Sequence, residues 1–124
     1  MIELTEAQIK KEVEDYLKDM MNLGRLYYER MNVGVFGRHH NIQGAKKGTA
    51  DYLVIQAGQV HLEYMKEQHG PGIPVSFVTW LECKTAIGKQ NKDQLEFQKR
   101  VEKLHCRYFI VRSVEELQEV LKRE

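Results

Sequence analysis

The stretch VSFVTWLECKT, residues 75–85, is the part of the chain that most strongly predicts a β-strand. Its branched and aromatic side chains suit a pleated, half-buried surface and are enriched in strands. A second apolar run, DYLVI at residues 51–55, is typical of a short strand covered on both faces, and Gly58 is expected to close it. We therefore expect residues 75–85 at the centre of a sheet, beside the strand that starts at Asp51.

Helices are predicted on either side of these strands. Apolar residues recur at helical spacing across residues 5–22, where Thr5 and Gln8 form a capping-box pattern and Gly24 can end the helix. A second amphipathic pattern covers residues 89–105. The alternation of helical and strand patterns favours an α/β fold.

The remaining segments complete a coarse element order. LYYERMNVGVF, residues 26–36, predicts a strand broken by Gly34, and the polar, basic segment at residues 37–50 predicts a loop. Residues 60–65 are interpreted as a returning hairpin strand, followed by a turn region across residues 66–74.

The C-terminal part predicts one strand and one helix. RYFIVR, residues 107–112, has strand character, and Ser113 with Glu116 three residues later predicts a capping box for the last helix. The expected order is helix, three or four strands, helix, strand, helix. We predict an α/β fold with a mixed central β-sheet flanked by helices, forming a single domain across residues 1–124.

Composition sets further bounds on function. A chain of 124 residues can bury one core without disulfides, and its net charge of +1 does not by itself indicate a nucleic-acid binder. Cys83 and Cys106 fit neither a disulfide scaffold nor a zinc ribbon, so a reduced compartment is expected. The charged N-terminal segment lacks the pattern of a signal peptide, and no membrane-spanning stretch is evident. These features predict a soluble, cytoplasmic protein.

Three charged residues interrupt the two strongest strands. Asp51 starts one, and Glu82 with Lys84 ends the other. Residues two apart in a strand share a face, and buried charges need partners, so these groups are expected to meet each other or a metal. Two converging carboxylates suit Mg²⁺ or Mn²⁺, and a nearby lysine suits phosphodiester hydrolysis.

The same residues carry a resemblance to a known family. Asp51 followed by Glu82-Cys-Lys84 resembles the core of the PD-(D/E)xK nucleases, and the wider pattern resembles the VRR-NUC family of virus-type replication and repair nucleases. The resemblance implies a restriction-endonuclease-like fold. It also implies a metal held by Asp51, Glu82 and the backbone carbonyl of Cys83, whose thiol would pack as a small hydrophobe, with Lys84 beside the attacking water. Ala50 departs from the family, which usually has proline there.

Supporting residues are implied by the resemblance as well. Glu6 in the N-terminal helix is carried over as a further catalytic residue and possible metal ligand, and Gln94 as a glutamine directed toward the active site. An R-x-N-x-G segment of the family is matched by Arg30, Asn32 and Gly34. Alternative interpretations stay open, since Glu6 could simply favour the positive end of its helix and Gln94 could be an exposed helix residue.

A basic loop predicts contacts with DNA phosphates. Arg38, Lys46 and Lys47, together with Arg30 and Asn32, are the candidate DNA-binding residues. A solvated loop is the alternative. The histidines at positions 39 and 40 face apart and lack a second pair at ligand spacing, which argues against a zinc site.

These features together predict a function. We expect a structure-selective DNA endonuclease that uses Mg²⁺ or Mn²⁺. Standalone domains of the family resemble phage Holliday-junction resolvases, which implies a homodimer acting on four-way junctions. Two alternatives are a flap or nicking nuclease on branched DNA, and a DNA-structure-binding module that does not cut. On the blandest interpretation, Glu82 and Lys84 form only a surface ion pair and Asp51 is a turn residue.

Overall fold

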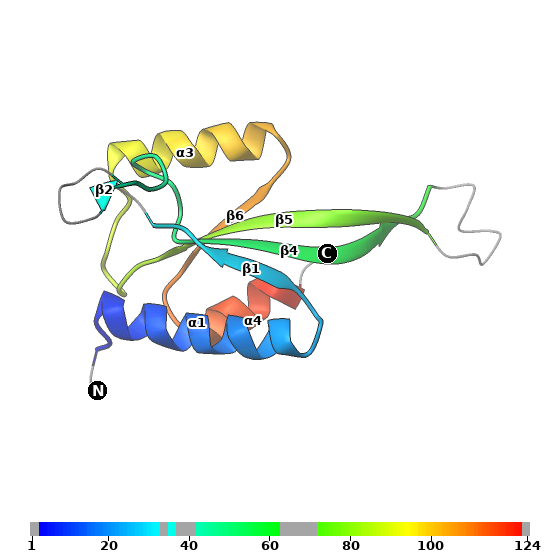
Figure 1. Ribbon diagram of the computed structural model, residues 1–124, viewed down its shortest axis with the longest axis horizontal. Helices are drawn as coiled ribbons and strands as arrows, with labels where there is room; N and C mark the ends of the chain where they lie inside the picture. Colours follow the sequence, from blue (N-terminus) through cyan, green and yellow to red (C-terminus); the bar gives the residue numbers. More distant parts are fainter. Residues whose placement is uncertain (1–2, 33–34, 37–41, 63–71, 123–124) are drawn as a thin grey trace.

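The computed structural model describes residues 3–32, 35–36, 42–62 and 72–122. Figure 1 shows their arrangement and gives the element labels. The elements are α1 (Glu6–Asn22), β1 (Tyr27–Arg30), β2 (Val35–Phe36), β3 (Ile42–Gln43), β4 (Tyr52–Val60), β5 (Ile73–Cys83), α3 (Lys92–Lys103), β6 (Arg107–Val111) and α4 (Val114–Lys122).

One mixed sheet organises the domain. Its strand order is β1-β4-β5-β6, with antiparallel pairing from β1 to β5 and parallel pairing between β5 and β6. The crossover from β5 to β6 runs through α3, as a parallel pair requires. Both predicted central strands, β4 and β5, lie inside the sheet. The predicted small α/β domain with a mixed sheet flanked by helices is confirmed.

Helices cover the two faces of the sheet unequally. Figure 1 shows α1 and α4 on one face and α3 on the other. The larger core joins apolar residues of α1 and α4 to the sheet and is centred on Val13, Leu17, Val54, Leu81 and Leu117. The smaller core lies under α3. No helix in the described part of the chain combines the length and the hydropathy needed to cross a membrane.

Two of the three helices in the described part of the chain have the N-cap residue that the sequence predicts. The predicted capping box at Thr5 and Gln8 is present. Ser113 accepts a hydrogen bond from the Glu116 N–H at 3.2 Å, so it does cap α4. The predicted return bond is wrong, however, because the Glu116 carboxylate accepts from the Arg112 N–H at 2.9 Å instead. The helix α3 has an unpredicted capping box, formed with Asn91.

The predicted end of a strand at Gly58 is wrong. β4 continues to Val60, and Gly58 pairs with Val75 of β5. The aromatic ring of Phe77 lies directly over the glycine, where a Cβ atom would come within 1.8 Å of the ring. Glycine here makes room for a cross-strand ring and does not break the strand.

Three other predicted segments need correction. A returning strand at residues 60–65 is not formed in its described part, because Val60 ends β4 and residues 61–62 belong to no strand; residues 63–65 lie outside the described residues. Ile73, expected in a turn, starts β5. In the predicted loop at residues 37–50, Ile42–Gln43 pairs antiparallel with Val35–Phe36, away from the main sheet.

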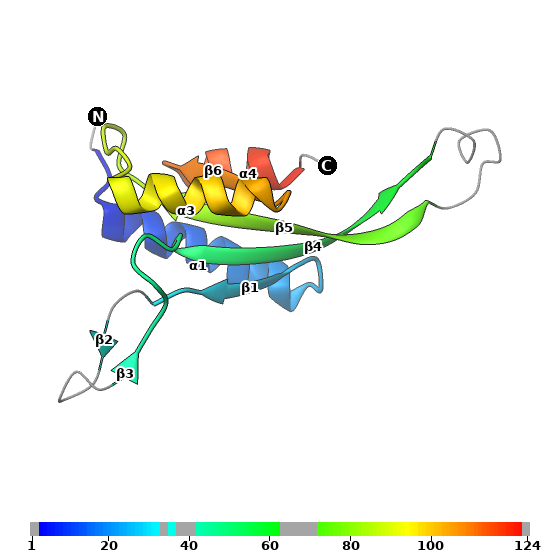
Figure 2. The same ribbon diagram turned by 90° about the horizontal axis from the view of Figure 1, so that it is seen from above.

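The far ends of β4 and β5 form an arm that projects beyond the helices (Figures 1 and 2). β1 pairs only with residues 52–55 of β4, and β6 pairs only with residues 79–83 of β5. We define the arm as the described residues 56–62 and 72–78. None of them is Asp, Glu, Lys or Arg, although 30% of the whole chain is charged.

Candidate active site

Asp51 and Glu82 meet at the end of the sheet opposite the arm. The last pair of the β4–β5 register at this end is Tyr52 with Leu81. Asp51, just before Tyr52, and Glu82, just after Leu81, therefore lie beside each other. The backbone N–H of Cys83 donates a hydrogen bond to Asp51 Oδ2 at 2.7 Å, which fixes this carboxylate against the end of β5. The hairpin therefore brings together two residues that are thirty-one positions apart in the sequence.

Glu82 is an unusual residue to find inside a sheet. Its side chain is buried, and its Oε1 atom has no hydrogen-bond partner among the described residues. Burial raises the pKa of Glu82 to about 9, helped by a hydrogen bond and charge repulsion from Asp51 and opposed by Lys84 and Lys10. Near neutral pH the metal-free carboxyl pair therefore holds a proton.

Lys84 follows directly after β5 and is held at this end of the sheet. Its backbone N–H donates to the Val111 carbonyl at 3.1 Å. Arg112 secures the next residues by donating from Nη1 to the carbonyls of Thr85 and, at 2.9 Å, Gly88. The Lys84 ammonium lies near enough to lower the pKa of Glu82. The predicted trio of Asp51, Glu82 and Lys84 thus lies together.

Lys10 is a site residue that sequence reasoning missed. Its Nζ atom lies 3.4 Å from Asp51 Oδ1 and 3.6 Å from Glu6 Oε2. Burial would lower the pKa of Lys10, but the carboxylates of Asp51 and Glu6 outweigh this and raise it. The i, i+4 spacing from Glu6 was the available signal, since it places both residues on one face of α1.

Glu6 and Gln94 lie in the first turns of α1 and α3, which both start at this end of the sheet (Figure 1). Glu6 is linked to Asp51 through the Lys10 ammonium, which pairs with both carboxylates. The side-chain oxygen of Gln94 accepts a hydrogen bond from the Asn91 N–H at 3.0 Å, so it forms part of the cap of α3.

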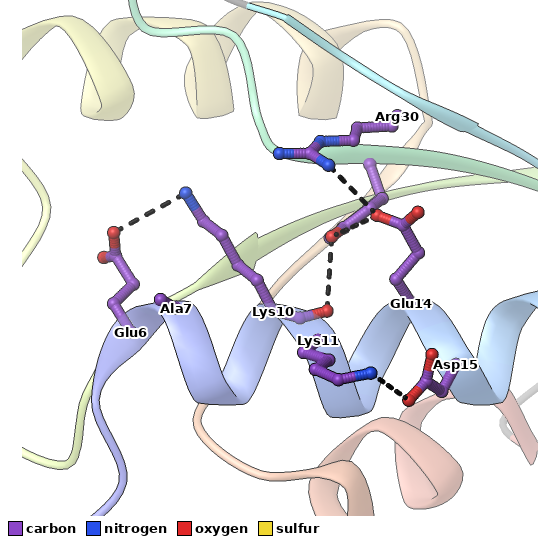
Figure 3. A pocket seen from close by; sticks show the side chains of 8 residues that line it. Glu6, Ala7, Lys10, Lys11, Glu14, Asp15 and Arg30 are labelled. Carbon is purple, nitrogen blue, oxygen red and sulfur yellow. Dashed lines mark hydrogen bonds and ion pairs between the residues drawn. The ribbon is translucent and has the colours of Figure 1, made fainter.

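A cavity of about 490 Å³ opens on the α1 side of this site (Figure 3). Figure 3 shows Lys10 and Glu14 extending into it from α1, with Arg30 above them. Arg30 pairs with Glu14 at 3.6 Å, and the Tyr52 hydroxyl donates to Glu14 Oε1 at 3.1 Å. Arg30, a predicted DNA contact, therefore lies at this cavity but engages an acidic partner.

The other predicted DNA contacts lie elsewhere. Lys46 and Lys47 are exposed on the α3 side, where Lys47 pairs with Asp93 at 3.5 Å. Asn32 is exposed, and its carbonyl accepts a hydrogen bond from the Ala45 N–H. Arg38 and Gly34 lie outside the described residues. The predicted basic surface is thus divided between the two sides of the sheet.

The residues at the sheet end fit a divalent cation. Within the described ranges, no group of three or more His, Cys, Asp or Glu side chains could hold a metal ion, so side chains alone give two carboxylates. The unpartnered Oε1 of buried Glu82, next to Asp51, is the kind of oxygen that a hard cation would satisfy. The thiol of Cys83 is buried in the larger core, as predicted, which leaves only its backbone to take part.

Comparisons with known proteins give no relative for this chain. No family model, no curated protein and no solved structure matches it. The site residues themselves therefore have to indicate the function.

Proposed function

We propose that this chain is a metal-dependent nuclease that hydrolyses phosphodiester bonds in DNA, with a restriction-endonuclease-like fold of the VRR-NUC type. One observation carries the proposal: Glu82 is a buried carboxyl group with an unpartnered oxygen, beside Asp51 and two residues before Lys84. Such a group destabilises a fold unless a cation or a proton compensates it. Strongly perturbed carboxyls with a specific charged partner are typical of functional sites.

Each residue of the site has a role in this chemistry. Asp51, Glu82 and the Cys83 carbonyl would hold Mg²⁺ or Mn²⁺, which supplies Lewis acidity at the phosphate when bound. Lys84 positions the attacking water and stabilises negative charge on the phosphate oxygens. Lys10 pairs with Asp51 and Glu6 in the metal-free protein and offsets part of their negative charge. Gln94 supports the site by fixing the first turn of α3.

We propose branched DNA as the substrate, with a homodimer acting on four-way junctions. A net charge of +1 is more consistent with geometric selectivity than with strong nonspecific binding. A two-fold dimer would present two equivalent sites to the two-fold symmetric junction. Cutting of flaps or nicks, and junction binding without cleavage, are the competing functions that the test below separates.

The test compares cleavage of labelled four-way junction, flap, linear duplex and single-stranded DNA with Mg²⁺ or Mn²⁺. Lys84→Ala is expected to lose cleavage and keep DNA binding, since its charge acts on the reacting phosphate. Lys89→Ala is the matched control, because Lys89 is an exposed lysine on the same connection. Paired cuts in the junction would support the resolvase role, and flap cutting would support the alternative nuclease role. Cleavage retained by Lys84→Ala would contradict the assignment of the site.

A further inference from the structure

A groove on the α3 side of the sheet has no role in the chemistry above. Its volume is about 550 Å³, in the range that accommodates a nucleotide-sized ligand. The apolar part of its lining includes Trp80 of β5, Phe97 of α3 and Met31. Its rim carries Lys46, Lys47, Arg100, Asp93 and Glu96. We call it the α3 groove.

The aromatic side chains of the α3 groove are fixed in place. The rings of Trp80 and Phe97 meet edge to face, with centroids 4.9 Å apart. Phe97 in turn contacts the buried ring of Tyr108, at 6.3 Å between centroids. Trp80 and Phe97 nevertheless stay partly exposed. Rigid and accessible aromatic rings are the platforms on which unstacked bases bind.

The opposite wall of the α3 groove is backbone packed tightly on the start of α3. Gly48 has a φ of +90°, and a Cβ atom there would lie 2.4 Å from the Asp93 carbonyl oxygen. Only glycine permits this close approach. This packing places the backbone of Lys46 and Lys47 beside the start of α3, so both lysines lie at the rim of the groove.

The charges on the rim favour an anionic ligand. Lys47 and Asp93 compensate each other in an ion pair. Lys46 and Arg100 are exposed and form no ion pair within the described part of the chain, while Glu96 is the one remaining acid in the lining. A surplus of one positive charge beside aromatic rings matches a nucleotide, whose base is apolar on its faces and whose phosphate is negative.

The α3 groove is related to the candidate active site through β5, which contributes Trp80 to the groove and Glu82 to the site. Side chains alternate along a strand, so Trp80 and Glu82 lie on the same face, with Cα atoms roughly 7 Å apart. A DNA strand whose phosphate lies at Asp51 and Glu82 can therefore place a neighbouring nucleotide at Trp80.

We propose that the α3 groove binds one unstacked nucleotide of a DNA strand, with its base against Trp80 and Phe97 and its phosphates near Lys46 and Arg100. This inference rests on the proposed nuclease function and refines its substrate class. Fully paired duplex keeps its bases stacked inside the helix and cannot fill the groove. A flap, or another branch that carries unpaired nucleotides, can fill it, so among the proposed substrates the α3 groove favours flaps over a fully paired four-way junction.

Fluorescence provides a direct test, because Trp80 is the only tryptophan of the chain. The protein is titrated in EDTA, where no cleavage occurs, with three oligonucleotides of equal length: single-stranded, abasic single-stranded and blunt duplex. The single strand is expected to quench Trp80, and the abasic strand and the duplex are expected to leave its emission nearly unchanged. Equal quenching by the abasic strand, or none by the single strand, would overturn the inference.

Charge variants on α3 check the location. Arg100→Gln is expected to weaken single-strand binding about threefold, the effect of losing one phosphate contact. Lys103→Gln is the matched control on the same helix and outside the groove lining, and it is expected to bind like the unaltered protein. An equal loss in both variants would show that the helix attracts DNA only through its overall charge and would overturn the site.

The two proposals fail separately. Lys84→Ala keeps the α3 groove intact and is expected to quench as fully as the unaltered protein. Quenching without any metal-dependent cleavage would support nucleotide binding in the α3 groove and contradict the nuclease function. Metal-dependent cleavage without base-dependent quenching would support the nuclease function and contradict nucleotide binding in the α3 groove.

Discussion

Burial of the Glu82 carboxyl group is unfavourable for folding, but the same group is a proposed metal ligand. A glutamine would fill the same volume and carry no charge, yet the chain places a carboxyl group there, 3% exposed and next to Asp51. In the metal-free protein a proton compensates this carboxyl. On the proposed function a cation takes the proton's place, so metal binding and proton release are coupled.

The pH dependence of stability follows from this pKa. Because the folded protein raises the pKa of Glu82 from 4.5 to about 9, it holds a proton that the unfolded chain has already released. The free energy of unfolding contributed by this residue is therefore present below pH 4.5 and is lost as pH rises toward 9. In EDTA, Glu82→Gln is expected to match the unaltered protein near pH 5 and to exceed it in melting temperature near pH 9. Identical pH profiles from thermal unfolding would contradict the raised pKa.

The residues of the candidate site could be predicted from the sequence only where they interrupt a clear pattern. Asp51, Glu82 and Lys84 stood out because charges interrupt apolar strands, and their meeting followed from strand pairing. Lys10 did not stand out, because a lysine on an amphipathic helix is usually solvated. Its role depends on the distance from α1 to Asp51, and this is a tertiary property that no local pattern contains.

At the level of elements, Gly58 and Phe77 illustrate the limit of local rules. Glycine is a poor strand former, so the sequence predicted the end of a strand. The ring of Phe77, which lies two residues along β5 from Val75, the pairing partner of Gly58, covers the space that a side chain would need. The helices in the described part of the chain were predicted because helical spacing is a local signal, as is the confirmed capping box of Thr5 and Gln8, whereas this strand depends on a cross-strand neighbour.

The Gly58 contact yields a stability prediction. Gly58→Ala is expected to destabilise the protein by about 1–3 kcal/mol, because the new methyl group overlaps Phe77 and forces the ring or the strand to move. Urea denaturation measures the effect. In a Phe77→Leu background the same change is expected to cost clearly less, since a smaller side chain leaves room. An equal cost in both backgrounds would show that the ring is not the cause.

At the scale of the whole molecule, the arm is a two-stranded ribbon that projects from the sheet, where neither β1 nor β6 pairs with it. A two-stranded ribbon is marginally stable in water, and exposed strand edges tend to pair with other strands. Proteins usually protect such edges with charged side chains, but the arm has none in its described part. Val60 and Ile73, paired across the ribbon, are 42% and 44% exposed. An uncharged partner surface, such as the arm of a second copy, would match it better than DNA would.

The proposed homodimer can be tested through the arm. Light scattering is expected to give about twice the 14.6 kDa mass of one chain for the unaltered protein. The double variant Val60→Lys/Ile73→Lys is expected to be monomeric, because two buried charges per arm would oppose association. Ile87→Lys is the matched control, since Ile87 is 80% exposed and distant from the arm. A monomeric unaltered protein at working concentration would contradict the dimer.

The pairing of β4 with β5 also determines where the chain can change in length. Asp51 lies beside Glu82 only because nine consecutive residue pairs, from Tyr52 with Leu81 to Val60 with Ile73, keep one register. One residue inserted within either strand would turn the remaining side chains to the opposite face, or would have to be absorbed as a bulge. Residues added between Leu62 and Gly72 shift nothing in that register. Chains with this architecture are therefore expected to differ in length between the positions of Leu62 and Gly72 and to be nearly constant along the two strands.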